Sequence, residues 1–350
     1  MTTFILSLFT LFLNPPEKGY KILVGTYTDS GSEGIYLFSL GGNMNQQSLL
    51  AKTNGVPNPS FLAYEKGKVF AVNELEDGKI QSYALKNNKF EFISEQSTNG
   101  AYPCHLSYAE GQVFVANYGE GSFLAYKVDE TGAISLPHFV YQNKGTGPVT
   151  DRQEKAHMHS VTVHGKELWA ADLGTDEVLV YSIPEIKEVK KIKMTPGSGP
   201  RHITFHKSLP LAYVINELNN TITVVNTKTY QSVQEISTLP KGFSGTSFCA
   251  DIHFSPDQKY LYGSNRYSDG LARFKVDAKT GLLSFEEVQS VEGKVPRNFA
   301  ISPDGKWILV ANQDSNDIVI FERNTKTGKI KFTGNTISIP KPVFVKFIEE

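Results

Sequence analysis

Short apolar runs alternate with polar turns along almost the whole chain. One phrase recurs: a short apolar strand, a tight turn, and a second apolar strand that ends on a polar residue. Val, Ile, Tyr and Phe are frequent in these runs, and no convincing helical period lies between them. Such patterning is typical of β-strands. It predicts an all-β protein.

The polar residue at the end of the second strand marks the repeat. It occurs at Thr26, Asn73, Asn117, Asp172, Asn216, Asn265 and Asn312. Successive positions are 44 to 55 residues apart, close to the length of a four-stranded propeller blade. SPDQK from Ser255 and SPDGK from Ser302 are typical hairpin turns. We therefore predict a seven-bladed β-propeller over residues 20–350, in which the recurring Asn side chains cap turns.

The two ends of this segment complement each other. YKILVGTY from Tyr20 supplies a second strand with no first strand ahead of it. ISIPKPVFVKF from Ile337 supplies a first strand with no second strand after it. We expect these N- and C-terminal strands to pair in one blade and close the ring.

Residues 1–19 precede the first repeat and leave the location of the protein open. The apolar run Phe4–Leu13 has the length of a signal-peptide core and is too short to span a bilayer. Met1–Thr3 carries no Lys or Arg, and no clear small-x-small cleavage site follows. A cleaved export signal, which implies a periplasmic or secreted protein, and an extra strand or misassigned start, which implies a cytoplasmic one, both remain.

Composition excludes several classes of partner. The 350 residues carry a formal net charge of −1, so no global field attracts nucleic acid or acidic membranes. The Lys-rich run Lys187–Lys193 alternates with apolar residues as a surface strand would. With two Cys in the chain, neither a disulfide framework nor a cysteine metal site is expected. We expect a monomer without stable membrane insertion and with two buried free thiols.

Equivalent positions of the blades form rings around the propeller axis. In the first strands, the ring aligned from the sequence is Ser60, Cys104, His159, Arg201, Ala250, Arg297 and Lys341. In the second strands it is Tyr27, Glu74, Tyr118, Leu173, Glu217, Arg266 and Gln313. Guanidinium groups in a narrow funnel need an anionic partner. That partner is either a substrate or, in the plainer interpretation, a channel carboxylate such as Glu217, Glu74 or Asp251.

Several motifs make the chain similar to a known family. GPVTDRQEKAHMHSV from Gly147, PCHLS from Pro103, GSGPRHITFH from Gly197, VINELNNTI from Val214 and ADIHFSPD from Ala250 together resemble the propeller lactonases. These include 6-phosphogluconolactonases and carboxymuconate cyclases. The ordered set is specific, whereas SPDG alone is common to many propellers.

The resemblance implies a catalytic set of His159, Arg201, Glu217 and Arg266, the residues that the rings also select. His105, His157, Tyr118, Arg297 and Lys341 are expected to bind substrate. The implied reaction is hydrolysis of an anionic, 6-phosphogluconolactone-like sugar lactone, in which Glu217 or His159 serves as base. No metal and no cofactor are expected. Two alternatives stay open: a carboxymuconate-type cycloisomerase and a non-catalytic propeller that binds an acidic ligand or protein.

Overall fold

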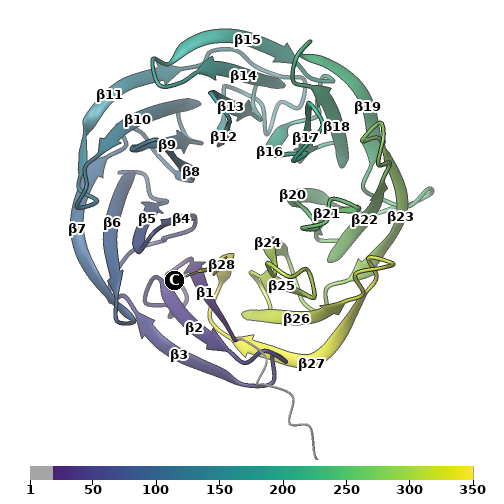
Figure 1. Ribbon diagram of the computed structural model, residues 1–350. Coiled ribbons are helices and arrows are strands. Elements are labelled where there is room, and N and C mark those ends of the chain that lie inside the picture. Colours follow the sequence, from purple (N-terminus) through teal and green to yellow (C-terminus); the bar gives the residue numbers. More distant parts are fainter. Residues whose placement is uncertain (1–18, 350) are drawn as a thin grey trace, which may run out of the picture.

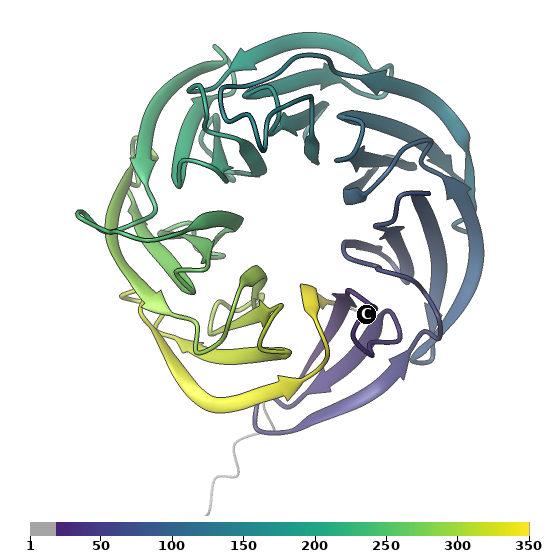
Figure 2. The ribbon, with the colours of Figure 1, turned by 180° about the vertical axis from the view of Figure 1, so that it is seen from behind.

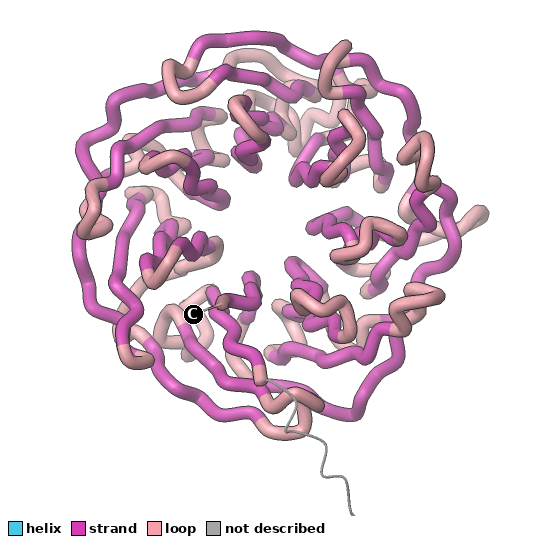
Figure 3. The backbone as a smooth tube through the Cα atoms, viewed as in Figure 1, coloured by secondary structure: helices cyan, strands magenta, loops and turns pink. Residues whose placement is uncertain are grey.

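The computed structural model describes residues 19–349, and every regular element in that range is a β-strand (Figure 3). The strands form seven four-stranded antiparallel sheets, arranged as blades in a ring (Figure 1; from the opposite face, Figure 2). The prediction of a seven-bladed β-propeller is confirmed. The leader or extension expected at residues 1–19 lies, apart from Gly19, outside the described residues.

Blade 1 joins the two ends of the chain. Its order from the axis outward is β28 (Pro342–Ile348), β1 (Tyr20–Thr26), β2 (Tyr36–Leu40) and β3 (Gln47–Lys52). β1 and β28 pair antiparallel, with Val24 opposite Val345. The expected closure of the ring by its terminal strands is therefore confirmed.

The other six blades follow in chain order, each with its first strand innermost (Figure 1). Blade 2 contains β4 (Leu62–Glu65), β5 (Lys68–Asn73), β6 (Lys79–Lys86) and β7 (Lys89–Ser97). Blade 3 contains β8 (Pro103–Ala109), β9 (Gln112–Asn117), β10 (Ser122–Val128) and β11 (Ile134–Gln142). Blade 4 contains β12 (Met158–His164), β13 (Glu167–Asp172), β14 (Glu177–Ser182) and β15 (Lys187–Lys193). Blade 5 contains β16 (Pro200–Phe205), β17 (Leu211–Asn216), β18 (Thr221–Asn226) and β19 (Gln231–Ser237). Blade 6 contains β20 (Phe248–Phe254), β21 (Tyr260–Arg266), β22 (Gly270–Val276) and β23 (Leu283–Ser290). Blade 7 contains β24 (Pro296–Ile301), β25 (Trp307–Asn312), β26 (Asp317–Arg323) and β27 (Ile330–Ser338).

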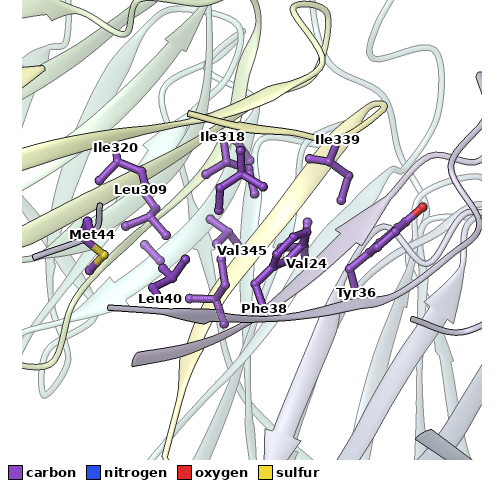
Figure 4. Close-up of a cluster of buried hydrophobic side chains, with 14 residues drawn as sticks. Val24, Tyr36, Phe38, Leu40, Met44, Leu309, Ile318, Ile320, Ile339 and Val345 are labelled. Carbon is purple, nitrogen blue, oxygen red and sulfur yellow. The ribbon is translucent and has the colours of Figure 1, made fainter. Parts of the chain in front are cut away.

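The core lies between the faces of neighbouring blades. Figure 4 shows the cluster at the closing interface, where Val24 and Phe38 of blade 1 face Leu309 and Ile318 of blade 7. Burying one such aliphatic or aromatic side chain contributes about 1.5–3 kcal/mol. The outermost strands contribute less. The predicted surface strand β15, for example, is exposed at every residue except Ile192.

The recurring polar residues at the ends of the second strands form hydrogen bonds with the backbone of the loops that flank the strands. Asn73 donates from its side chain to the carbonyl of Pro57 (2.8 Å), and Asn117 to that of Thr98 (2.8 Å). The carboxylate of Asp172 accepts from the backbone N–H groups of His157 and Gly174. These side-chain to backbone bonds agree with the expected capping role.

A β-bulge near the start of the innermost strands sets the ring that faces the axis. In blade 5, Pro200 lies opposite Asn216 but His202 lies opposite Ile215, so Arg201 is the extra residue. Cys104, His159 and Arg297 are the extra residues of their blades. A bulge redirects the side chain of its extra residue. Here it directs the ionisable side chains of these four residues toward the axis.

The register corrects one member of that ring. In blade 1, Thr26 pairs with Pro342 and Gly25 with Phe344, so the bulge residue is Val343. The sequence alignment placed Lys341 there, which was wrong by two positions. In blades 3, 5 and 7 a proline directly precedes the bulge residue, and Pro342 has this place in blade 1.

Candidate active site

Glu217 is the hub of the charged cluster at one end of the propeller axis. It follows β17 directly and is 2% exposed. Its Oε2 lies 3.0 Å from Arg201 Nε and 2.9 Å from Arg266 Nη2. His159 Nε2 lies 3.9 Å from the same oxygen. The four residues selected from the sequence therefore converge, and they come from the adjacent blades 4, 5 and 6.

The surroundings of Glu217 keep it ionised. Burial by itself would raise the pKa of its carboxyl group, but the guanidinium groups of Arg266, Arg201 and Arg152 outweigh burial and hold that pKa far below its usual range. Burial, together with Arg266 and Arg297, lowers the pKa of Arg201 to about 10, which leaves it charged at neutral pH. Glu217 is thus a permanent anion that accepts hydrogen bonds.

His159 is an uncharged imidazole beside this anion. Burial and the neighbouring Arg201, with smaller effects of His202 and Arg297, hold its pKa well below the usual value of a histidine. Its Nδ1 is 3.8 Å from the Sγ of Cys104, a buried free cysteine. At neutral pH a ring nitrogen of His159 is therefore available to accept a proton.

A third arginine joins the cluster and was not selected from the sequence. Arg152 Nη2 lies 2.5 Å from Glu217 Oε1 and donates to the hydroxyl of Tyr118 at 3.4 Å. Its side chain is 34% exposed, so it forms the outer layer over Glu217. It belongs to the long connection between blades 3 and 4, outside the repeat, so ring alignment could not find it. The only signal was its place in the GPVTDRQEKAHMHS motif.

That connection is fixed by buried polar contacts next to Arg152. Gln153 is fully buried and donates from Nε2 to the carbonyl of Leu173 and to Asp176 Oδ1, both at 2.8 Å. Its Oε1 accepts from the N–H of Val149 at 3.0 Å. These hydrogen bonds fix the backbone of the connection next to Arg152 and so hold Arg152 in place. We call Glu217, Arg152, Arg201, Arg266 and His159 the Glu217 cluster.

A second group of charged and polar side chains lies at the same end of the propeller axis as the Glu217 cluster, on blades 1, 2 and 7, and its contacts are longer. Tyr27 donates to both carboxylate oxygens of Glu74 at 3.0 Å. Arg297 Nη2 is 3.9 Å from Glu74 Oε1, and its guanidinium lies over the Tyr27 ring at 5.4 Å. Burial raises the pKa of the Tyr27 hydroxyl far above its usual value, so it remains a donor. Glu74, Tyr27 and Arg297 are called the Glu74 cluster below.

Two of the expected binding residues pack beside the Glu217 cluster. The rings of Tyr118 and His157 stack at 4.4 Å, and the edge of Tyr118 meets His159 at 5.5 Å. Both nitrogens of His157 are engaged, Nδ1 with the carbonyl of Tyr118 and Nε2 with Glu154. The structure thus places His157 as a support of Tyr118 rather than as an open group.

His105 and Lys341 lie away from the cluster. The ring of His105 packs tilted against Phe61, with the ring centroids 4.0 Å apart, and lines a cavity of about 510 Å³ that opens toward the opposite end of the axis. Lys341 Nζ lies 3.3 Å from the carboxylate of the exposed Asp29. The structure brings neither side chain to Glu217.

Among residues 19–349, no group of three or more His, Cys, Asp or Glu side chains is arranged to hold a metal ion. Within the same range there is no helix of the length and apolarity needed to cross a membrane.

Fold and site together define a class of protein. The molecule is a seven-bladed β-propeller with a permanent carboxylate, three guanidinium groups and a neutral imidazole gathered at one end of its axis. Charge-assisted donors beside a proton acceptor are what acyl transfer to water requires.

Comparisons with known proteins agree with this class. Residues 21–347 match the family model described as lactonase, 7-bladed beta-propeller. A 6-phosphogluconolactonase of Bacillus subtilis is 34% identical over 345 residues, which cover 93% of this chain and 98% of the relative. The structure of a periplasmic gluconolactonase of Pseudomonas aeruginosa superposes with a TM-score of 0.89 at 31% identity, covering 95% of this chain and 99% of that one. A Bacteroides fragilis structure, described as a candidate 6-phosphogluconolactonase, has the same TM-score at 35% identity and covers 95% and 98%.

The chain belongs to the seven-bladed β-propeller lactonase family, which confirms the resemblance found in the sequence. It is an enzyme of the carboxylic-ester hydrolase class, and the reaction in general terms is the hydrolysis of a lactone.

Proposed function

We propose that this protein hydrolyses a sugar lactone that carries an anionic group of its own, such as 6-phosphogluconolactone, to the aldonic acid. The observation that carries the proposal is the balance of charge at the site. Four guanidinium groups (Arg152, Arg201, Arg266 and Arg297) face two carboxylates (Glu217 and Glu74). The excess of positive charge suits a bound phosphate or carboxylate, because guanidinium forks match these groups.

In the proposed reaction His159 is the base. It takes a proton from water while the water oxygen attacks the lactone carbonyl carbon. Arg201 and Arg266 stabilise the oxyanion of the tetrahedral intermediate. The intermediate collapses by breaking the bond between the carbonyl carbon and the ring oxygen, and His159 returns its proton to that oxygen. The product is a hydroxy acid, which ionises in solution.

Glu217 supports this chemistry as an anchor. Because its oxygens already bind Arg152, Arg201 and Arg266, protonation of Glu217 would break three ion pairs, whereas the uncharged His159 has no such pairing to lose. The fixed charge of Glu217 instead orients Arg201 and Arg266 before substrate arrives, which is the preorganisation that lowers the barrier.

The binding of the anionic group falls to the outer arginines. Arg152 is the most exposed member of the Glu217 cluster, and Arg297 belongs to the loosely paired Glu74 cluster. A phosphate on the substrate would place the enzyme in the oxidative pentose phosphate pathway of glucose metabolism. A carboxylate would suit an exported enzyme equally well.

The test is a panel of purified lactones that differ in charge. We expect higher kcat/KM for 6-phosphogluconolactone or a carboxylated lactone than for neutral glucono-δ-lactone. Reactions without protein correct for spontaneous opening of the ring. Reaction in ¹⁸O water should label the product carboxylate, since only hydrolysis incorporates solvent oxygen. Equal rates on charged and neutral lactones would overturn the anion-binding assignment, and an unlabelled isomer would reveal a cycloisomerase. Binding of an acidic ligand without turnover would indicate a non-catalytic propeller.

A further inference from the structure

Asp251 is a buried carboxylate that the proposed reaction does not use. It lies in β20 of blade 6 and is 3% exposed. Its Oδ1 accepts from His202 Nδ1 at 2.8 Å and from the N–H of Ile252 at 2.9 Å. Its Oδ2 accepts from His253 Nε2 at 2.8 Å and from the side chain of Asn298. Every one of these partners donates, so Asp251 is held as an anion on the far side of the Glu217 cluster.

The contact with Asp251 fixes the tautomer of His202. A carboxylate can only accept, so His202 Nδ1 carries the proton and Nε2 is left as a bare acceptor. Arg201 Nη1 lies 3.1 Å from that Nε2, and a guanidinium can only donate. Burial and the charge of Arg201 lower the pKa of His202 to about 4. His202 is therefore a neutral acceptor at neutral pH.

Hydrogen bonds hold the guanidinium of Arg201 at two of its three nitrogens. Its Nε donates to Glu217 at 3.0 Å, and its Nη1 donates to His202 and to the carbonyl of Ala250 at 2.6 Å. Within residues 19–349 its Nη2 makes no hydrogen bond, so this nitrogen remains for a substrate oxygen. The direction in which Nη2 points is set by the three hydrogen bonds of Nε and Nη1.

The β-bulge of β16 makes the contact between Arg201 and His202 possible. Consecutive residues of a regular strand point to opposite faces. Because Arg201 is the extra residue of the bulge, it and its neighbour His202 contact each other beside the axis instead. His202 and Asp251 both line the 510 Å³ cavity at the opposite end of the axis, whereas Arg201 does not.

We propose that His202 is a positioning residue for Arg201, holding its guanidinium so that Nη2 meets the oxyanion, and that Asp251 serves only to fix the tautomer in which His202 Nε2 can accept. The inference rests on the proposed function only for the identity of the oxygen that Nη2 meets. The placement of Arg201 by His202 stands on the contacts above.

Two substitutions at one position separate the two contacts of His202. In His202→Asn the side-chain amide takes the place of Nδ1, so Asp251 keeps a donor and Arg201 loses its acceptor. In His202→Gln the amide oxygen takes the place of Nε2, so Arg201 keeps its acceptor and Asp251 loses a donor. His253→Gln is the matched control, because it alters only the other oxygen of Asp251 and its side chain is 43% exposed.

Steady-state kinetics on the best lactone of the panel give the first readout. We expect His202→Asn to lower kcat by about tenfold to a hundredfold with KM little changed, since a small misplacement of a catalytic group costs this much. His202→Gln and His253→Gln should stay close to wild type. Wild-type kcat in His202→Asn would overturn the inference, as would equal losses in His202→Asn and His202→Gln that follow a lower melting temperature.

Crystal structures of the two variants test the inference without any activity. Displacement of the Arg201 guanidinium from Glu217 in His202→Asn, but not in His202→Gln, supports it. An unmoved guanidinium in His202→Asn overturns it. If the wild-type protein hydrolyses no lactone, the proposed function fails, and these structures still decide whether His202 positions Arg201.

Discussion

Glu217 and Glu74 occupy equivalent ring positions, yet they are bound in different ways. Glu217 is 2% exposed and contacts three guanidinium groups, two of them within 3.0 Å of one oxygen. The Glu74 side chain is 15% exposed, bonds to the Tyr27 hydroxyl and has one guanidinium at 3.9 Å. One half of the site is tight and saturated, whereas the other half is loose.

Under the proposed function, this difference corresponds to two tasks within one site. Transition-state stabilisation needs donors that are fixed before the reaction, and the Glu217 cluster has this character. Ground-state binding of a charged group tolerates a looser arrangement, because the substrate completes the ion pairing on arrival. We therefore expect changes in the Glu217 cluster to act on kcat and changes in the Glu74 cluster to act on KM.

The largest effect is expected for Glu217→Gln. The substitution leaves three arginines facing a neutral amide, and breaking a buried ion pair by removing one partner costs about 3–5 kcal/mol of stability. With both Arg201 and Arg266 no longer oriented, kcat should fall by about a thousandfold or more. Urea denaturation and steady-state assays measure the two effects. Glu74→Gln is the matched comparison and should leave kcat near wild type. Similar losses of kcat in both variants would contradict the distinction between the two clusters.

The next effect separates two arginines. Arg201→Ala should lower kcat by about 10²–10³, because the partner charge of Arg201 develops during the reaction. Arg297→Ala should mainly raise KM for an anionic lactone, since it would bind ground and transition states alike. Initial rates over a range of substrate concentrations distinguish the two outcomes. A kcat loss in Arg297→Ala as large as that in Arg201→Ala would contradict the division.

How much of this was predictable depends on the repeat. Glu217 and Arg266 follow the recurring Asn of neighbouring blades, so their common ring could be read from spacing alone. Lys341 was misplaced because the bulge residue of blade 1, Val343, is itself apolar and was aligned with the first buried apolar residue of the other blades, which lies two positions later. Arg152 lies in a connection that no repeat constrains, so its contact with Glu217 depends on how Gln153 anchors the loop.

A smaller effect is expected from pH. Because burial and Arg201 lower the pKa of His159 well below 6.5, the imidazole stays neutral as the pH falls to 6.5 and is protonated only further into acid. We expect kcat/KM to be level near neutrality and then to fall about tenfold per pH unit below that pKa. The unfolded chain protonates this histidine earlier, so the free energy of unfolding should also decrease as the pH falls below about 6.5.

The pH profile of His159→Gln checks this assignment. Its residual activity should lack the acid limb, because the titrating base is gone. An acid limb of unchanged midpoint in His159→Gln would assign the titration to another group.

The smallest effect is expected for Tyr27→Phe in the Glu74 cluster. The substitution removes the hydroxyl that bonds to both oxygens of Glu74 and keeps the ring that lies under Arg297. A freed Glu74 should draw Arg297 closer and compete with the anionic group of the substrate. KM for an anionic lactone should then rise about twofold to threefold, as the loss of one hydrogen bond to a loosely held charge would give, and kcat should not change. Tyr20→Phe is the matched control, because its hydroxyl bonds to Asp304 on an exposed surface. A fall in kcat for Tyr27→Phe with unchanged KM would mean that the Glu74 cluster takes part in the chemical step, and the two halves of the site would then act as one.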